Sequence, residues 1–260
     1  MPTVELDPSA PHVILILTLI GVLFGVINTL AGGGSVLSLP ALLLLGLPPH
    51  AANATNRVVG ITQTLSALWS FARKGELRGT PVALIALIAS VGGVIGARLS
   101  LLLSQSQMNL CIQLCLGSIA TFTLLAPKRL FEEPPPPARS PSAQLFGALI
   151  ASLYGGFIQA GIGLVSLYYM RFICGHTLVK ATALKVVFIT ALTIPSLLTF
   201  IYYGQVWWLS GVALAFGGLL GAQLGVHLSL GAQGGKVIRT ALPFAAILML
   251  IGLVWRTLGG

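Results

Sequence analysis

Two glycine clusters, each followed by a short apolar run, are the feature of this sequence that most directly indicates a binding site. Gly33 and Gly34 precede Ser35 and a run of about 12 apolar residues, and Gly161 and Gly163 precede a second short run. A 12-residue helix is about 18 Å long, too short for a hydrocarbon core of ~30 Å. Backbone N–H groups at glycines and helix starts favour anions. The pair predicts the central site of a transporter, with close helix packing as the alternative.

Polar side chains occupy matching places in the two halves of the chain. Asn28 and Gln159 precede the glycine clusters, while Asn56 and Lys185 lie a few residues inside long apolar runs. Amides offer donors and acceptors, and a lysine in an apolar run suits an anionic substrate. The alternatives are interhelical hydrogen bonding for the amides and, for Lys185 and neighbouring Arg57, extension to the lipid headgroups.

Acidic residues occur only in the predicted loops and the N-terminal tail, so none is available to neutralise Lys185. They are Glu5, Asp7, Glu76, Glu132 and Glu133. A cation transporter or a carboxylate proton relay normally has an acid inside the membrane. We therefore expect an anion as the substrate.

The composition of the chain predicts a membrane protein. Hydrophobic residues make up 56% of its 260 residues and charged residues 7%, whereas a soluble domain carries about 25% charged residues. The apolar runs are long and do not alternate, which favours helices over a barrel. We expect an all-α polytopic membrane protein with roughly eight to ten crossings.

The chain divides into two repeats joined by a linker. Apolar runs are expected at about 12–31, 35–47, 51–72, 80–103, 107–126, 143–161, 163–175, 181–203, 207–230 and 237–255. The interval between the fifth and sixth is polar and contains four consecutive prolines, which favour an extended chain. We predict a first repeat over 1–127, a cytoplasmic linker over 128–142 and a second repeat over 143–260.

The repeat is visible as glycines matched at an offset of 129 residues. The matches include Gly46 with Gly175, Gly75 with Gly204, Gly92 with Gly221 and Gly96 with Gly225. Equivalent loops differ in charge, because 73–78 is basic whereas 203–206 is uncharged. The positive-inside rule then places them on opposite sides, so we predict inverted repeats of about five helical segments each.

The net charge of +9 comes from 14 basic and 5 acidic residues. Positive-inside loops and cations that hold an anion both contribute to this excess. The basic residues are scattered among apolar runs, so nucleic-acid binding is not expected. The apolar runs contain no Ser, His and acid set and no metal-binding cluster, so we predict no enzyme activity, no metal and no cofactor.

Several motifs together resemble the TauE/SafE family of sulfite exporters, over about residues 21–253. They are Gly25-x-x-Asn28, Ala31-Gly32-Gly33-Gly34-Ser35, Ala52-x-Ala54-Thr55-Asn56, Gly155-Gly156-x-x-Gln159-x-Gly161-x-Gly163 and Ala181-x-Ala183-x-Lys185. The resemblance implies transport of sulfur-containing anions such as sulfite, sulfonates or sulfoacetate across the bacterial inner membrane, without covalent chemistry.

The expected function is therefore secondary transport of such an anion by alternating access. The substrate-binding residues predicted are Asn28, Gly33, Gly34, Ser35, Asn56, Arg57, Gln159, Gly161, Gly163 and Lys185. An anion-selective channel is the first alternative, and a membrane-embedded enzyme or an assembly subunit ranks below it. The partners expected are the anion, the lipid bilayer and, in a homodimer, a second copy of the chain.

Overall fold

The computed structural model describes residues 10–31, 35–73, 75–77, 82–125 and 138–229. This part of the chain contains helices and no strand. The helices are α1 (Pro11–Ala31), α2 (Ser35–Leu44), α3 (Pro49–Arg73), α4 (Val82–Leu101), α5 (Gln105–Leu125), α6 (Pro141–Phe157), α7 (Ile162–Tyr168), the π-helix Tyr169–Ile173, α8 (Leu178–Tyr202) and α9 (Trp208–Ser229). The all-α prediction is confirmed.

Helix boundaries follow the predicted apolar runs closely, and local capping explains where two helices begin. Ser140 caps α6 by accepting a hydrogen bond from the Ala143 amide, and Pro141 occupies the first turn, where its missing N–H costs nothing. α6 therefore begins inside the range predicted as linker. Thr177 caps α8 in the same way. The predicted run 237–255 lies outside the described residues.

Glycines let the long helices approach at backbone contact distance. On α1, a Cβ added at Gly25 would clash with the backbone of Gly218 and Gly221 on α9. On α4, a Cβ at Gly96 would clash with the backbone of α6 at Leu153 and Phe157. Small residues at such crossings allow the close van der Waals packing that drives helix association in lipid.

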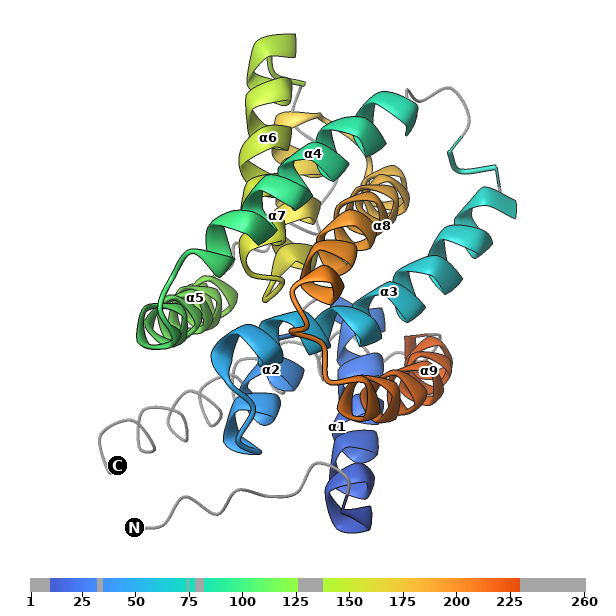
Figure 1. Ribbon diagram of the computed structural model, residues 1–260. Coiled ribbons are helices and arrows are strands. Elements are labelled where there is room, and N and C mark those ends of the chain that lie inside the picture. Colours follow the sequence, from blue (N-terminus) through green and yellow to red (C-terminus); the bar gives the residue numbers. More distant parts are fainter. Residues whose placement is uncertain (1–9, 32–34, 74, 78–81, 126–137, 230–260) are drawn as a thin grey trace.

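The helix contacts form the same pattern in the two halves. Under the 129-residue offset α3 corresponds to α8 and α4 to α9, while α1 corresponds to α6. α1 packs on α9 as α6 packs on α4, and α3 contacts α9 as α8 contacts α4. α3 and α8 contact each other, and Figure 1 shows α3 crossing the middle of the molecule. The inversion of the repeats across the membrane stays a prediction.

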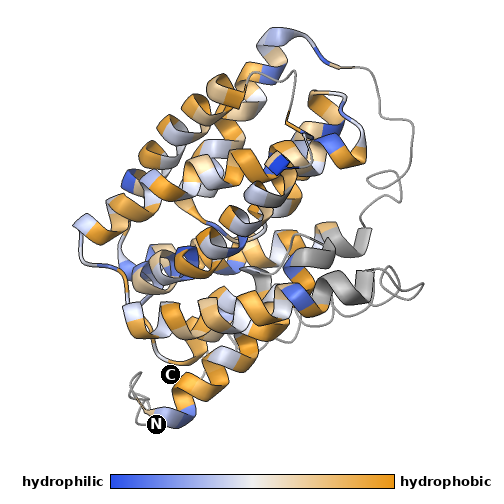
Figure 2. Ribbon diagram, turned by 90° about the vertical axis from the view of Figure 1, so that its right-hand side faces the viewer, coloured by the Kyte–Doolittle hydropathy of each residue, from blue (hydrophilic) through white to orange (hydrophobic). Residues whose placement is uncertain are grey.

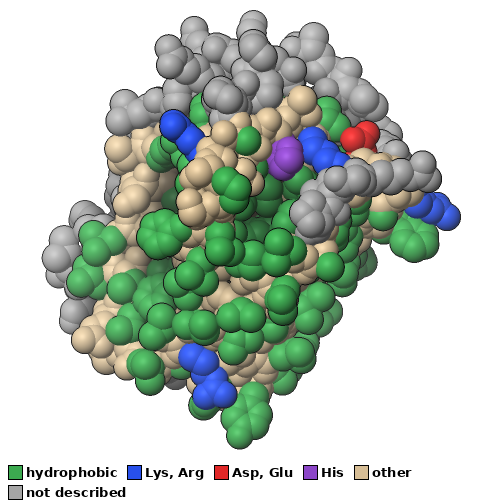
Figure 3. Space-filling model, turned by 90° about the horizontal axis from the view of Figure 1, so that it is seen from above, with side chains coloured by type: hydrophobic (Ala, Val, Ile, Leu, Met, Phe, Trp, Pro, Cys, Tyr) green, Lys and Arg blue, Asp and Glu red, His purple; other side chains and the backbone are tan. Residues whose placement is uncertain are grey.

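The outer surface of the bundle is apolar. Figure 2 shows hydrophobic residues predominating on the helices, with hydrophilic residues gathered in the middle. Figure 3 shows a broad field of hydrophobic side chains with few charged ones. Three described helices are long and apolar enough to cross a membrane, at Pro11–Asn28, Val82–Leu101 and Leu178–Tyr202. These features are those of a polytopic membrane protein, and the number of crossings stays a prediction.

Candidate functional site

The helix breaks of the two halves meet inside the bundle. Ser35 is the first residue of α2, and residues 158–161 join α6 to α7. The Ser35 hydroxyl accepts a hydrogen bond from the Gly161 amide at 3.0 Å and donates one to the Gln159 carbonyl at 3.3 Å. Ser35 and Gln159 are both buried. The two segments that the glycine clusters predicted as one site are therefore in direct contact.

Gly161 is required at this junction for two reasons. Its φ of 67° lies in the left-handed region, which side chains other than glycine rarely adopt. A Cβ at this position would also clash with the side chain of Ile119 on α5.

A small cavity of about 30 Å³ lies where the two breaks meet. This volume is similar to that of one water molecule. Its polar wall consists of Asn28, Ser35, Asn56, Thr64 and Gln159. The remaining lining residues are Phe24, Gly60, Ile162, Gly163 and Ile189. The cavity therefore joins residues of α1, α2, α3, α7 and α8 with the segment between α6 and α7.

Hydrogen bonds fix the orientation of the two asparagines. Asn28 donates through Nδ2 to Oε1 of Gln63 at 2.6 Å, and Gln63 in turn donates to the Gly218 carbonyl of α9 at 2.9 Å. Ser38 of α2 donates to Oδ1 of Asn56. Both asparagines are thus held by neighbouring helices, as a preorganised binding site requires.

Two amide atoms in the cavity wall have no hydrogen-bond partner. They are Nδ2 of Asn56 and Oε1 of Gln159, and both are buried. Gln159 donates through Nε2 to the Thr193 hydroxyl at 3.4 Å. Rotating the Gln159 amide by 180° would let Thr193 donate to Oε1 and leave Nε2 as the amide atom without a partner. In that orientation the cavity offers two amide donors, which suits an anion.

Five of the ten predicted site residues line this cavity, namely Asn28, Ser35, Asn56, Gln159 and Gly163. Gly161 adjoins it through the bond to Ser35. Gly33 and Gly34 lie outside the described residues.

Lys185 is partly exposed on α8 and is not among the residues that line the cavity. It precedes Ile189 by four residues and Thr193 by eight, so the three positions lie on one side of the helix. Ile189 lines the cavity and Thr193 contacts Gln159. Lys185 therefore lies about one helical turn from the cavity wall.

Arg57 was predicted to bind substrate, but in the structure its hydrogen bonds go to the protein. It is fully buried and donates to the carbonyls of Gly155, at 3.1 Å, and Gly156, at 2.6 Å, at the end of α6. It also donates to Ser196 of α8 at 2.9 Å and stacks over Phe200 with 4.9 Å to the ring centre. The last carbonyls of a helix lack intrahelical donors and carry partial negative charge, which the guanidinium complements.

Asn53, one turn before Arg57, completes this contact and was not predicted. Its Nδ2 donates to the Phe157 carbonyl at 2.8 Å, and its Oδ1 accepts from the Gln159 amide at 3.4 Å. Asn53 and Arg57 thereby hold the segment that carries Gln159.

The polar face of α3 was visible in the sequence as a spacing of three to four residues. Asn53, Asn56, Gly60, Gln63 and Thr64 follow this period. Gly60 and Thr64 line the cavity, and Gln63 positions Asn28. The period of this polar face is therefore the sequence signal that points to Gly60, Gln63 and Thr64.

Arg171 is a second fully buried arginine that the sequence analysis did not single out. It lies in the π-helix and donates to the His176 carbonyl at 3.3 Å. Within the described ranges no group of three His, Cys, Asp or Glu side chains could hold a metal ion.

Comparisons with a family model and with known proteins both indicate a membrane transporter. A family model described as sulfite exporter TauE/SafE matches residues 17–254. The probable membrane transporter protein YfcA of Escherichia coli strain K12 is 30% identical over 96% of this chain and 93% of its own length. The probable membrane transporter protein ORF9 of a Sinorhizobium species is 27% identical over 94% and 93%. No solved structure matches the chain.

Proposed function

The chain belongs to the sulfite exporter TauE/SafE family of membrane transporters, and on that premise we propose that it is a secondary transporter of a small sulfur-containing anion. The substrate class is sulfite, a sulfonate or sulfoacetate. The membrane is the bacterial inner membrane, and the mechanism is alternating access.

One observation carries this proposal: the meeting of two helix breaks at a buried cavity whose unpartnered amide atoms belong to Asn56 and Gln159. A buried amide without a partner costs about 1–3 kcal/mol, and a ligand that binds it removes that cost. The two amides come from different halves of the chain, so a bound anion would join the halves.

The charge balance supports an anion. Among the residues that the structure describes, Glu76 is the only acid, and it lies in the loop that follows α3. The cavity wall itself carries no charged side chain. Lys185, about one turn away on α8, is the cation that would neutralise the substrate.

The arrangement of the helices supports alternating access. The cavity lies where helices of both halves meet, because α3 and α8 contact each other and both contribute to its wall. A cavity of about 30 Å³ is too small for a sulfur oxyanion, so it must widen before such an anion can bind. Substrate entry requires the helices around the cavity to move apart, and alternating access would open it first to one side of the membrane and then to the other.

Reconstitution into liposomes tests the proposal. Uptake of radiolabelled sulfite should saturate and should be accelerated by unlabelled sulfite trapped inside. Asn56→Ala should raise the KM at least tenfold, because a hydrogen bond to a charged ligand contributes about 1.5–3 kcal/mol. Flux that does not saturate and shows no counterflow would identify an anion channel instead. If no candidate anion enters faster than it enters liposomes without the protein, both the transporter and the channel are rejected.

A further inference from the structure

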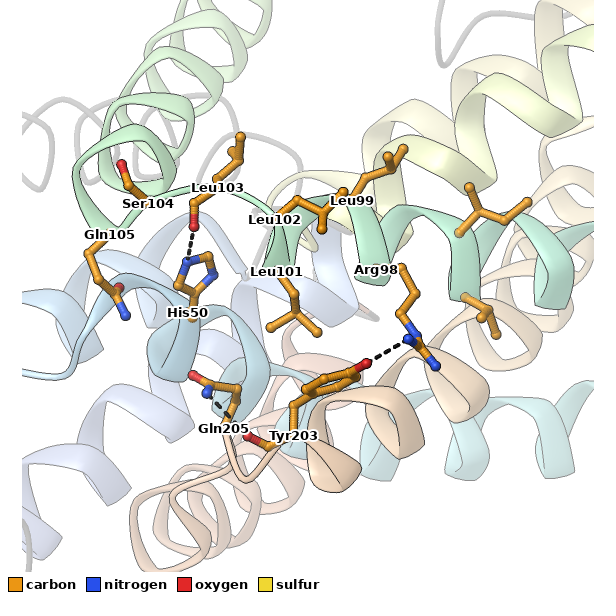
Figure 4. Close-up of a pocket in the computed structure, with 12 residues that line it drawn as sticks. His50, Arg98, Leu99, Leu101, Leu102, Leu103, Ser104, Gln105, Tyr203 and Gln205 are labelled. Atoms are coloured by element: carbon orange, nitrogen blue, oxygen red, sulfur yellow. Dashed lines mark hydrogen bonds between the residues drawn. The ribbon is translucent and has the colours of Figure 1, made fainter.

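A second and larger cavity, of about 670 Å³, lies at the surface of the bundle. It is formed where α3 begins and where α4 and α8 end (Figure 4). Its volume is in the range of about 300–1,000 Å³ that is usual for small-molecule sites. None of its lining residues lines the central cavity.

Arg98 gives this cavity its charge. The side chain is exposed, donates through Nη1 to the Tyr203 hydroxyl at 2.6 Å and lies over the Tyr203 ring with 5.1 Å to its centre. The only acid of the described part, Glu76, follows the far end of the 25-residue helix α3. Such a helix is about 37 Å long, so this carboxylate cannot neutralise Arg98.

His50 provides a buried polar group in the wall of the same cavity. It is 6% exposed, and its Nε2 lies 3.1 Å from the Leu103 carbonyl (Figure 4). Its Nδ1 has no hydrogen-bond partner. Bonding of Nε2–H to a carbonyl leaves Nδ1 as an acceptor for a hydroxyl of the ligand.

An apolar stripe continues from Arg98 along the outside of α4. Leu87, Val91 and Ile95 are 62%, 49% and 43% exposed and recur at intervals of four residues. Side chains at this spacing lie on one side of a helix. The adjoining aromatic residues Tyr202 and Trp208 are also exposed, as is typical of the membrane–water interface. The cavity therefore has a cationic end at the interface and an apolar track that leads toward the membrane interior.

We propose that this cavity binds an anionic phospholipid. The lipid phosphate pairs with Arg98, the polar part of the headgroup contacts His50 and Gln205, and one acyl chain follows the stripe on α4. Charge complementarity and the amphipathic lining together select this occupant, because a soluble anion would leave the apolar track without a ligand.

Native mass spectrometry of the purified full-length protein in detergent tests the proposal. Phosphatidylglycerol and phosphatidylcholine with the same acyl chains are titrated separately. We expect phosphatidylglycerol to bind about tenfold more tightly, and Arg98→Gln to remove that difference, because a charge-assisted bond is lost. Tyr203→Phe removes the acceptor that orients Arg98 and should weaken binding about threefold. It also serves as the test if Arg98→Gln fails to fold.

Arg73→Gln is the matched control. Arg73 is also an exposed arginine stacked on an aromatic ring, with 4.7 Å to the centre of Trp69, but it lies at the other end of α3. This variant should bind phosphatidylglycerol like the unaltered protein. Equal affinity for the two lipids, or an equal loss in Arg73→Gln, would overturn the proposal. Displacement of the lipid by an equal concentration of glycerol 3-phosphate would also overturn it, by identifying a site for soluble oxyanions.

Discussion

Gly60→Ala tests the proposed site against a purely structural role for Gln159, because transport should be impaired while stability stays nearly unchanged. A Cβ built at Gly60 lies 2.5 Å from Nε2 of Gln159 and 3.3 Å from its Cδ. Ordinary contact requires about 3.5 Å, so the Gln159 amide must move by about 1 Å. Gly60 and Gln159 both line the cavity of about 30 Å³, which the methyl group and the displaced amide would fill.

Two opposing contributions determine how Gly60→Ala changes the stability of the protein. Alanine in place of glycine inside a helix stabilises by about 0.5–1 kcal/mol. Overpacking costs about 1–3 kcal/mol in a rigid core, but less here because the group displaced is the end of a flexible side chain. We therefore expect a melting temperature within a few degrees of the unaltered protein. Displacing Gln159 from an anion should cost about 1.5–3 kcal/mol, which raises the KM ten- to hundredfold.

The assay is sulfite uptake into liposomes, with the melting temperature measured on the same preparation. Gly147→Ala is the matched control, because its Cβ would lie 3.0 Å from the Tyr169 ring, away from the cavity. Gly147→Ala also replaces a helical glycine by alanine and also brings a methyl group against a side chain. The Gly147→Ala protein should transport sulfite normally. A folded Gly60→Ala protein with an unchanged KM and Vmax would refute the placement of the substrate beside Gln159.

Three further outcomes are expected. Lys185→Ala should abolish transport while the protein still inserts into the membrane, as membrane fractionation would show; normal uptake would remove Lys185 from the site. Arg57→Met should lower stability by about 3 kcal/mol, because buried carbonyls of α6 lose their donor; an unchanged melting temperature would contradict this role. Burial, and then the charge of Lys180, lower the pKa of His176 in the loop before α8. Its neutral form is favoured in the folded protein, so stability should fall as the pH drops below about 6.5, and His176→Gln should reduce that fall.

Much of the helical framework could be predicted from the sequence. Nine of the predicted apolar runs correspond to described helices, because an apolar run in lipid must satisfy its own backbone hydrogen bonds. The matched pairs predicted Asn28, Asn56 and Gln159 as parts of one site, and the structure places these three residues around one cavity. Repetition made this prediction possible, since equivalent positions in two halves packed together lie near one centre.

The role of Arg57 could not be predicted in the same way. Its partners are backbone carbonyls about 100 residues away in the sequence, at the end of α6. Every residue has a carbonyl, so the sequence does not show which carbonyls lack a helical donor and face an arginine. The interpretation of Arg57 as a substrate ligand followed from its type and neighbourhood alone.

The sequence by itself determined that the chain is an all-α membrane protein and which segments are broken by glycine, because composition and periodicity are local properties. Only the tertiary structure decided that Ser35 meets the Gln159–Gly161 segment, that Gly60 faces Gln159, and that Arg98 has no described carboxylate near it. These relations join residues from different helices, and they depend on the close approach that glycine contacts permit between α1 and α9 and between α4 and α6.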